Sequence, residues 1–192
     1  MQTLGLSSEI KRSDGWLKSL LWPTVDNAWD VDYLGQQGMW ICTIVAVFSL
    51  ITTAFSGNPI IVFVGLLSTL FFLLGGMGIR ESNWPAAAFV FAVYLLGALS
   101  GTSMIPILFG VVLLSNLRAT FLASEWKPVA EGEDRPTRFN ETLADKYIDQ
   151  LPAKLWPKLH IPFMVLGVAM LLLNLAGLAI VLAHRFAAPA HP

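Results

Sequence analysis

Charged residues are scarce in this sequence, and the few that occur are unevenly placed. Only 13% of the 192 residues are Asp, Glu, Lys or Arg, whereas soluble domains carry roughly 25%. Between Tyr33 and Asn116 the only charged side chains are Arg80 and Glu81. This segregation excludes an ordinary soluble domain. It predicts an all-α integral membrane protein, because about 20 apolar residues cross the hydrocarbon core of a bilayer.

Residues that commonly carry chemistry are also few. The single cysteine, Cys42, lies inside an apolar run, which excludes a disulfide framework and a thiolate cluster. His160 and His184 bracket the last apolar run, about 36 Å apart along a helix, so they cannot share a metal or a haem. His191 lies in the tail. One alternative is a haem bridged between His160 and its symmetry mate.

The sequence has no basic excess and none of the short motifs of catalysis. Its net charge of −1 gives no reason to expect nucleic acid binding. We find no nucleophile motif, no phosphate loop and no paired carboxylates within the apolar runs. We therefore expect a protein that is not an enzyme, with no catalytic residues, no cofactor and no metal site.

What the sequence does contain is a set of five apolar runs, which predicts a bundle of five transmembrane helices. Proline lies in the first turn expected for each run after the first, where its missing N–H group is no loss. These prolines are Pro59, Pro85, Pro106 and Pro162. The predicted segments are a cytoplasmic N-terminal segment with an interfacial helix (1–33), a four-helix membrane hairpin block (34–122), a cytoplasmic loop with an amphipathic helix (123–160), the fifth transmembrane helix (161–184) and an extracytoplasmic tail (185–192).

The positions of the cations orient this predicted bundle. Lysines and arginines occur before the first run, at Arg80, at Arg118, in the segment 123–160 and at Arg185, whereas the turns 56–58 and 101–103 carry no charge. Five spans put all of these cations except Arg185 on one side, as the positive-inside rule expects. If 85–122 held one span and a re-entrant piece, the cationic loop would lie outside. We expect a bacterial inner (plasma) membrane protein with a cytoplasmic N-terminus and an extracytoplasmic C-terminus.

The N-terminal segment predicts a short helix on the membrane surface before the first span. Trp16, Leu17, Leu20 and Leu21 share one helical face, and packing on the protein's own cytoplasmic loop is the alternative. Proline at position 23 ends this helix. Thr24 is then expected to cap the helix of the first span, with Val25, Asp26 and Asn27 as its first turn. Asp26, Asp30 and Asp32 are expected to stay in water.

The loop 123–160 predicts a second amphipathic helix at about 141–151. Leu143, Tyr147, Ile148 and Leu151 share its apolar face, and the following LPAKLWPKLH is expected to run along the interface. Tryptophans often anchor at that depth. We expect interfacial positions for Trp16, Trp22, Trp84, Trp126 and Trp156.

Few polar residues lie within the apolar runs. Asn174, near the middle of the fifth run, could contact a substrate. We favour a hydrogen bond to a neighbouring helix, contributing about 0.6–2 kcal/mol. The glycines Gly75, Gly76 and Gly78, and the pair Gly97 and Gly101, predict close helix approach.

Four residues at two predicted span ends form a candidate inner-face cluster. Arg80 and Glu81 follow the second span, whereas Asn116 and Arg118 end the fourth. Both ends lie at the same depth in a five-span bundle. We predict that Arg118 contacts Glu81 or the backbone near Gly78, with a solvated Arg118 as the alternative.

The stretches GQQGMW, GIRESNWPAAAFVFAVYLL and LLSNLRATF resemble those of a loose group of small multi-span bacterial inner-membrane proteins of unknown function. The likeness covers roughly residues 20–123. It implies that Arg80, Asn116 and Arg118 matter at the inner face, and it implies no activity.

These observations together favour a non-enzymatic accessory or scaffold subunit of a membrane protein assembly. Its expected partners are the lipid bilayer and other membrane protein chains or itself. The alternative is a small transporter or permease that acts as a homo-oligomer. A membrane enzyme acting on lipid is a third hypothesis, for which the sequence offers no site.

Overall fold

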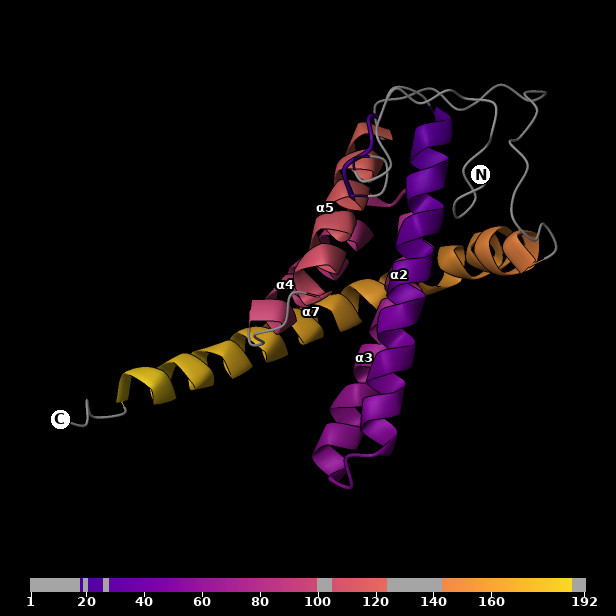
Figure 1. Ribbon diagram of the computed structural model, residues 1–192. Coiled ribbons are helices and arrows are strands. Elements are labelled where there is room, and N and C mark those ends of the chain that lie inside the picture. The colour runs from indigo at the N-terminus through magenta and orange to yellow at the C-terminus, as the bar shows by residue number, and fades with distance from the viewer. Residues whose placement is uncertain (1–17, 19–20, 26–27, 100–104, 124–142, 188–192) are drawn as a thin grey trace.

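The described part of the computed structural model is helical throughout its regular elements (Figure 1). The structure describes residues 18, 21–25, 28–99, 105–123 and 143–187. Its elements are α2 (Ala28–Ala54), α3 (Pro59–Arg80), α4 (Trp84–Leu99), α5 (Ile105–Ala123), the π-helical η1 (Ala144–Gln150) and α7 (Leu151–Ala187). The predicted all-α class is confirmed.

Three of the described helices are long and apolar enough to cross a membrane. They comprise most of α2, the whole of α3, and the continuous helix formed by η1 and α7. Helices α4 and α5 are apolar but shorter, with 16 and 19 residues. Length and composition therefore establish three membrane-length helices, and the five predicted spans are not confirmed.

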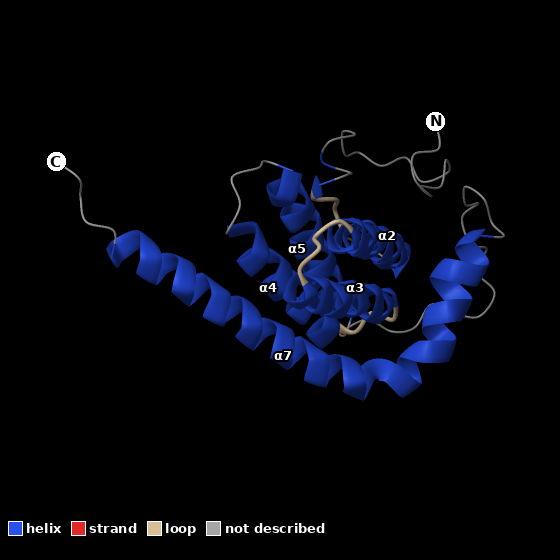
Figure 2. Ribbon diagram, turned by 90° about the horizontal axis from the view of Figure 1, so that it is seen from below, coloured by secondary structure: helices blue, strands red, loops and turns tan. Residues whose placement is uncertain are grey.

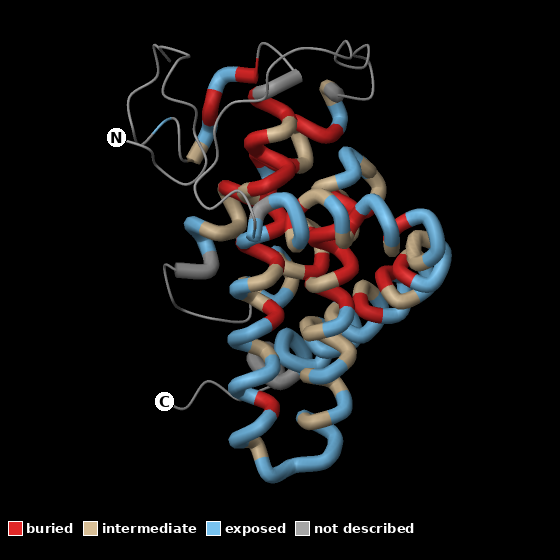
Figure 3. The backbone as a smooth tube through the Cα atoms, turned by 90° about the vertical axis from the view of Figure 1, so that its right-hand side faces the viewer, coloured by how far each residue is buried: buried red, intermediate tan, exposed pale blue. Residues whose placement is uncertain are grey.

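Helices α2 and α3 form an antiparallel hairpin through the turn 55–58. Gly57 adopts a left-handed φ of 62°, and the Asn58 side chain accepts a hydrogen bond from the Ile60 N–H at 2.9 Å. Asn58 and Pro59 thus start α3 as predicted. Because a Cβ atom on Gly65 would collide with Thr53 Oγ1, glycine lets the two helices pack closely here. Figure 3 shows that the hairpin tip is exposed.

The charged stretch after α3 forms a tight turn, as predicted. Ser82 adopts a φ of 53°, and the Asn83 N–H donates to the Gly78 carbonyl at 2.9 Å. This pattern ends a helix in the Schellman manner. The Asn83 side chain then accepts from the Ala86 N–H at 3.0 Å, which caps α4.

The main core is formed by α2, α3, α4, α5 and α7 together. Phe163 of α7 stacks on Phe71 of α3 at a centroid distance of 5.3 Å and contacts Trp156 at 5.5 Å. Trp156 is buried in this core, and its interfacial depth stays a prediction. A Cβ atom on Gly78 would lie 2.5 Å from both Ala86 Cβ and the Trp156 ring. The predicted close approach at the α3 glycines is therefore confirmed.

The predicted amphipathic helix and fifth span are one continuous helix. Pro157 and Pro162 both lie inside α7, so the predictions that Pro162 begins a helix and that the amphipathic helix ends near 151 are wrong. Proline removes a backbone donor and kinks a helix without necessarily ending it. A His160 ring nitrogen lies 3.0 Å from the Pro157 carbonyl and gives it a side-chain partner. Figure 2 shows the bend of this helix, and α7 runs along α3 and α4.

The structure also corrects the start of the first long helix. Thr24 and Val25 precede α2, which begins at Ala28, and Thr24 Oγ1 accepts a hydrogen bond from Lys18 Nζ at 3.2 Å. Val25 is buried against an apolar cluster that includes Ala119 of α5, which favours a non-helical path. Asp30 is only 5% exposed, so the expectation that it stays in water is wrong.

Two other predictions fall largely outside the described residues. They are the interfacial helix around residues 16–21 and the part 124–142 of the loop 123–160, together with Trp16, Trp126 and Gly101. The described tryptophans at positions 22 and 84 are exposed.

Candidate functional site at the polar end of the bundle

Arg80, at the end of α3, joins three helical elements. Its Nη2 atom lies 2.6 Å from Asp32 Oδ1 of α2 and 2.6 Å from Asp149 Oδ1 of η1. Its Nε atom also donates to Asp149 Oδ1 at 3.1 Å. The Arg80 and Asp149 side chains are only 11% and 18% exposed. One guanidinium therefore connects the α2–α3 hairpin to the start of the η1–α7 helix.

Neighbouring polar groups hold this ion pair in place. Gln36 Nε2 donates to the second oxygen of the Asp32 carboxylate at 2.7 Å, one helical turn along α2. The Tyr147 hydroxyl of η1 lies 2.8 Å from Thr43 Oγ1, and its ring packs on Trp40. Element η1 is thus attached to α2 and α3 by an ion pair and a separate hydrogen bond.

Glu81 follows Arg80 but lies on the exposed side of the turn. Partial burial raises the pKa of its carboxyl above the ordinary value of 4.5, Asp149 adds to this rise, and Arg80 opposes it. Within the described residues Glu81 forms no ion pair with Arg118. Arg80 and Glu81 therefore play different parts, although they are adjacent in the sequence.

Arg118 is held by the chain that precedes α2. Its Cζ atom lies 5.3 Å from the centroid of the Trp22 ring, and its Nη1 donates to the Pro23 carbonyl at 3.4 Å. The cation therefore lies on an aromatic face. The predicted contact with Glu81 or the backbone near Gly78 is wrong, because residues 22–25 pack over the end of α5 and provide nearer partners.

Asn116 lies between α5 and α2 and is fully buried. Its Nδ2 atom donates to the Val112 carbonyl at 2.8 Å, but its Oδ1 atom has no partner in the described structure. A Cβ atom on Gly38 would lie 2.7 Å from this oxygen. Close helix approach at Gly38 therefore brings the amide against the α2 backbone.

The four predicted inner-face residues thus form two groups at one end of the bundle. Arg80 pairs with acids, and Arg118 contacts the N-terminal segment. Sequence reasoning missed Asp32 and Asp149 as the partners of Arg80. The available signal was their sequence context, because Asp32 immediately precedes an apolar run and Asp149 lies on the polar face of the predicted amphipathic helix.

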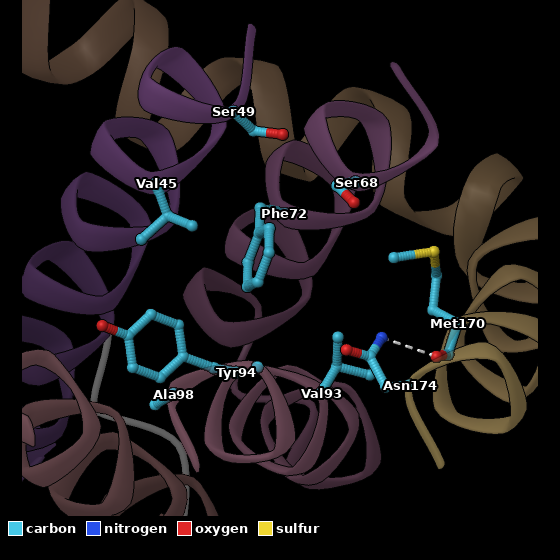
Figure 4. Close-up of a pocket in the computed structure, with 10 residues that line it drawn as sticks. Val45, Ser49, Ser68, Phe72, Val93, Tyr94, Ala98, Met170 and Asn174 are labelled. Carbon is cyan, nitrogen blue, oxygen red and sulfur yellow. Dashed lines mark hydrogen bonds between the residues drawn. The ribbon is translucent and has the colours of Figure 1, made fainter. Parts of the chain in front are cut away.

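Asn174 lies away from this end, at a groove bordered by four helices. Its Nδ2 atom donates to the Met170 carbonyl of its own helix at 2.8 Å. No hydrogen bond joins Asn174 to another helix in the part of the chain that the structure describes. Figure 4 shows the side chain facing the groove beside Val93 of α4.

The described residues contain no group of three His, Cys, Asp or Glu side chains that could hold a metal ion. The fold and its ion pairs define an all-helical bundle with three membrane-length helices. No family model, curated protein or solved structure matches the chain. The resemblance to small bacterial inner-membrane proteins therefore stays a prediction.

Proposed function

We propose that this protein is a non-enzymatic membrane subunit that binds other membrane protein chains through the outer half of α7, residues 169–183. The observation that carries the proposal is the low burial of this helix. Only 11% of the most apolar 18-residue stretch of this helix is buried within the chain. The corresponding stretches of the other two membrane-length helices are each 33% buried. Figure 2 shows this half of α7 extending beyond the bundle.

The side chains on the outer half of α7 suit a helical partner. Ala169, Ala176 and Ala183 recur at seven-residue spacing and are all exposed. A Cβ atom on Gly177 would meet nothing within 4 Å. Helices in a bilayer associate mainly by close packing of backbones across small residues, since lipid and leucine are equally apolar. Large exposed side chains such as Leu172 and Ile180 flank these positions.

We further infer that α4 and α5 also cross the bilayer, which makes five spans in a bacterial inner membrane. The polar end of the bundle then faces the cytoplasm, and α7 carries the chain to the opposite side. Two observations support this inference. The end of α3 and η1, which leads into α7, lie together at Arg80 and Asp149, and the α2–α3 hairpin tip carries no charge.

The mass of the detergent-extracted complex tests the proposed function. The wild-type chain should co-purify in an assembly larger than its own dimer. The double variant Ala176→Leu/Ala183→Leu should leave that assembly, because leucine separates the helix backbones. Ala153→Leu is the matched control, since Ala153 is exposed on α7 outside the proposed surface. A lone homodimer would favour the permease alternative, and a lone monomer would contradict both functions.

A further inference from the structure

The groove beside Asn174 has the shape and chemistry of a small-ligand site. It encloses about 320 Å³ between α2, α3, α4 and α7, within the range of roughly 300–1,000 Å³ typical of ligand pockets. Most of its wall is apolar, formed by Val45, Phe72, Val93, Ala98 and Met170. Figure 4 shows these side chains around one concavity.

Two polar side chains in this wall have hydrogen-bonding groups that are not used by the described residues. The described structure gives the Tyr94 hydroxyl no hydrogen-bond partner, although Tyr94 lines the groove. Asn174 uses one N–H for the Met170 carbonyl, which leaves its Oδ1 atom and second N–H available. In Figure 4 Tyr94 and Asn174 extend from different sides of the groove. The groove therefore offers one hydroxyl and one amide to a ligand.

The remaining polar side chains of the groove are already engaged. Ser49 Oγ donates to the Gly65 carbonyl at 3.1 Å, and Ser68 Oγ donates to the Val64 carbonyl at 2.9 Å. None of the ten lining residues is Asp, Glu, Lys, Arg or His. An ionised ligand would lose its hydration here without a countercharge, which is costly in an apolar site.

We propose that this groove binds a neutral lipid with an aliphatic body and one hydroxyl or carbonyl group. The aliphatic part contacts Phe72 and Met170, and the polar group bonds to Asn174 or Tyr94. The ligand enters from the bilayer, because the groove lies among membrane-length helices. This inference does not rest on the proposed function: Met170 and Asn174 line the groove, whereas Ala176 and Ala183 of the same helix are exposed and do not line it.

Photolabelling in phosphatidylcholine nanodiscs tests the proposal. The probe is a long-chain fatty alcohol with a diazirine in its tail, and unlabelled hexadecanol is the competitor. Gly97→Leu should reduce the labelling of groove peptides about tenfold, which corresponds to about 1.4 kcal/mol of binding free energy. Gly97 lines the groove, and its added Cβ would meet only Asn174 Oδ1, at 3.9 Å. The variant therefore fills the groove without a clash at the Cβ position.

Ala153→Leu is the matched control, because Ala153 is exposed on α7 outside both the groove and the proposed partner-binding surface. It should label as the wild type does. Asn174→Leu keeps the groove apolar but removes the amide, so competition by hexadecanol should weaken while competition by hexadecane stays unchanged. Equal labelling of wild type and Gly97→Leu would overturn the proposal and indicate bulk lipid contact only. Equal competition by hexadecane and hexadecanol in the wild type would also overturn it.

Discussion

Arg80 is the residue through which the α2–α3 hairpin holds the start of the last helix. It faces Asp32 and Asp149, which lie on elements far apart in the sequence. Losing one member of a buried ion pair commonly costs about 3–5 kcal/mol, because the partner charge is left uncompensated. Here partial exposure screens the charges. Removing Arg80 should therefore cost less than removing one member of a fully buried ion pair.

Arg80→Leu should destabilise the folded protein by about 1–3 kcal/mol, since it leaves two neighbouring carboxylates without their cation. Thermal unfolding in detergent measures this change. In the background of Asp32→Asn and Asp149→Asn, the same substitution should cost much less. Arg118→Leu is the comparison, and it should cost about 0.5–1 kcal/mol for a cation–π contact. An Arg80→Leu variant that melts like the wild type would contradict this account.

Glu81 should lower the stability of the folded protein at neutral pH, whereas Arg80 raises it. Burial, the largest cause, raises its pKa above 4.5 in the folded protein, so the folded state holds its proton more tightly than the unfolded chain. The contribution of Glu81 to stability is therefore greatest below pH 4.5 and falls as pH rises through the folded pKa. Glu81→Gln should raise the melting temperature slightly at neutral pH and have no effect in acid. Melting curves at both pH values check this, and a lower melting temperature at neutral pH would refute it.

At the scale of helices, local signals predicted some ends correctly and missed others. Asn58 and Pro59 begin α3 as expected, because a cap and an N-terminal proline act within one turn. Pro162 lies within α7, since tertiary packing keeps the helix continuous. The sequence also did not predict the contacts between elements, because these too depend on tertiary packing. Neither the path of residues 22–25 over Arg118 nor the placement of Asp149 beside Arg80 follows from sequence spacing.

The glycines of α3 did predict one long-range feature, which is the close packing of this helix against its neighbours. Gly78→Leu should destabilise the protein by about 1–3 kcal/mol, because its side chain would enter space occupied by Ala86 and Trp156. Denaturation in detergent measures the loss. Gly177→Leu makes the same substitution in open space, and its stability should equal that of the wild type or exceed it slightly. Similar losses for both variants would show that helix packing is not the cause.

At the scale of the whole molecule, charge separates the two ends of the bundle. Arg80 and its acid partners Asp32 and Asp149 gather where α3 ends and η1 begins, whereas the α2–α3 hairpin tip presents Phe55 and Ile60 without any charge. The sequence could predict this separation, because the positions of the charged residues along the chain are the same for any arrangement of the helices. It could not predict the groove beside Asn174, which exists only because α7 crosses the other helices.

The orientation of the chain in the membrane tests the central claim most directly. Five spans with a cytoplasmic N-terminus place the C-terminus outside. Alkaline phosphatase and a fluorescent protein, each fused after Pro192 in a bacterial host, report opposite sides of the inner membrane. We predict an active phosphatase fusion and a dark fluorescent fusion. A fluorescent C-terminal fusion with an inactive phosphatase would contradict the five-span account.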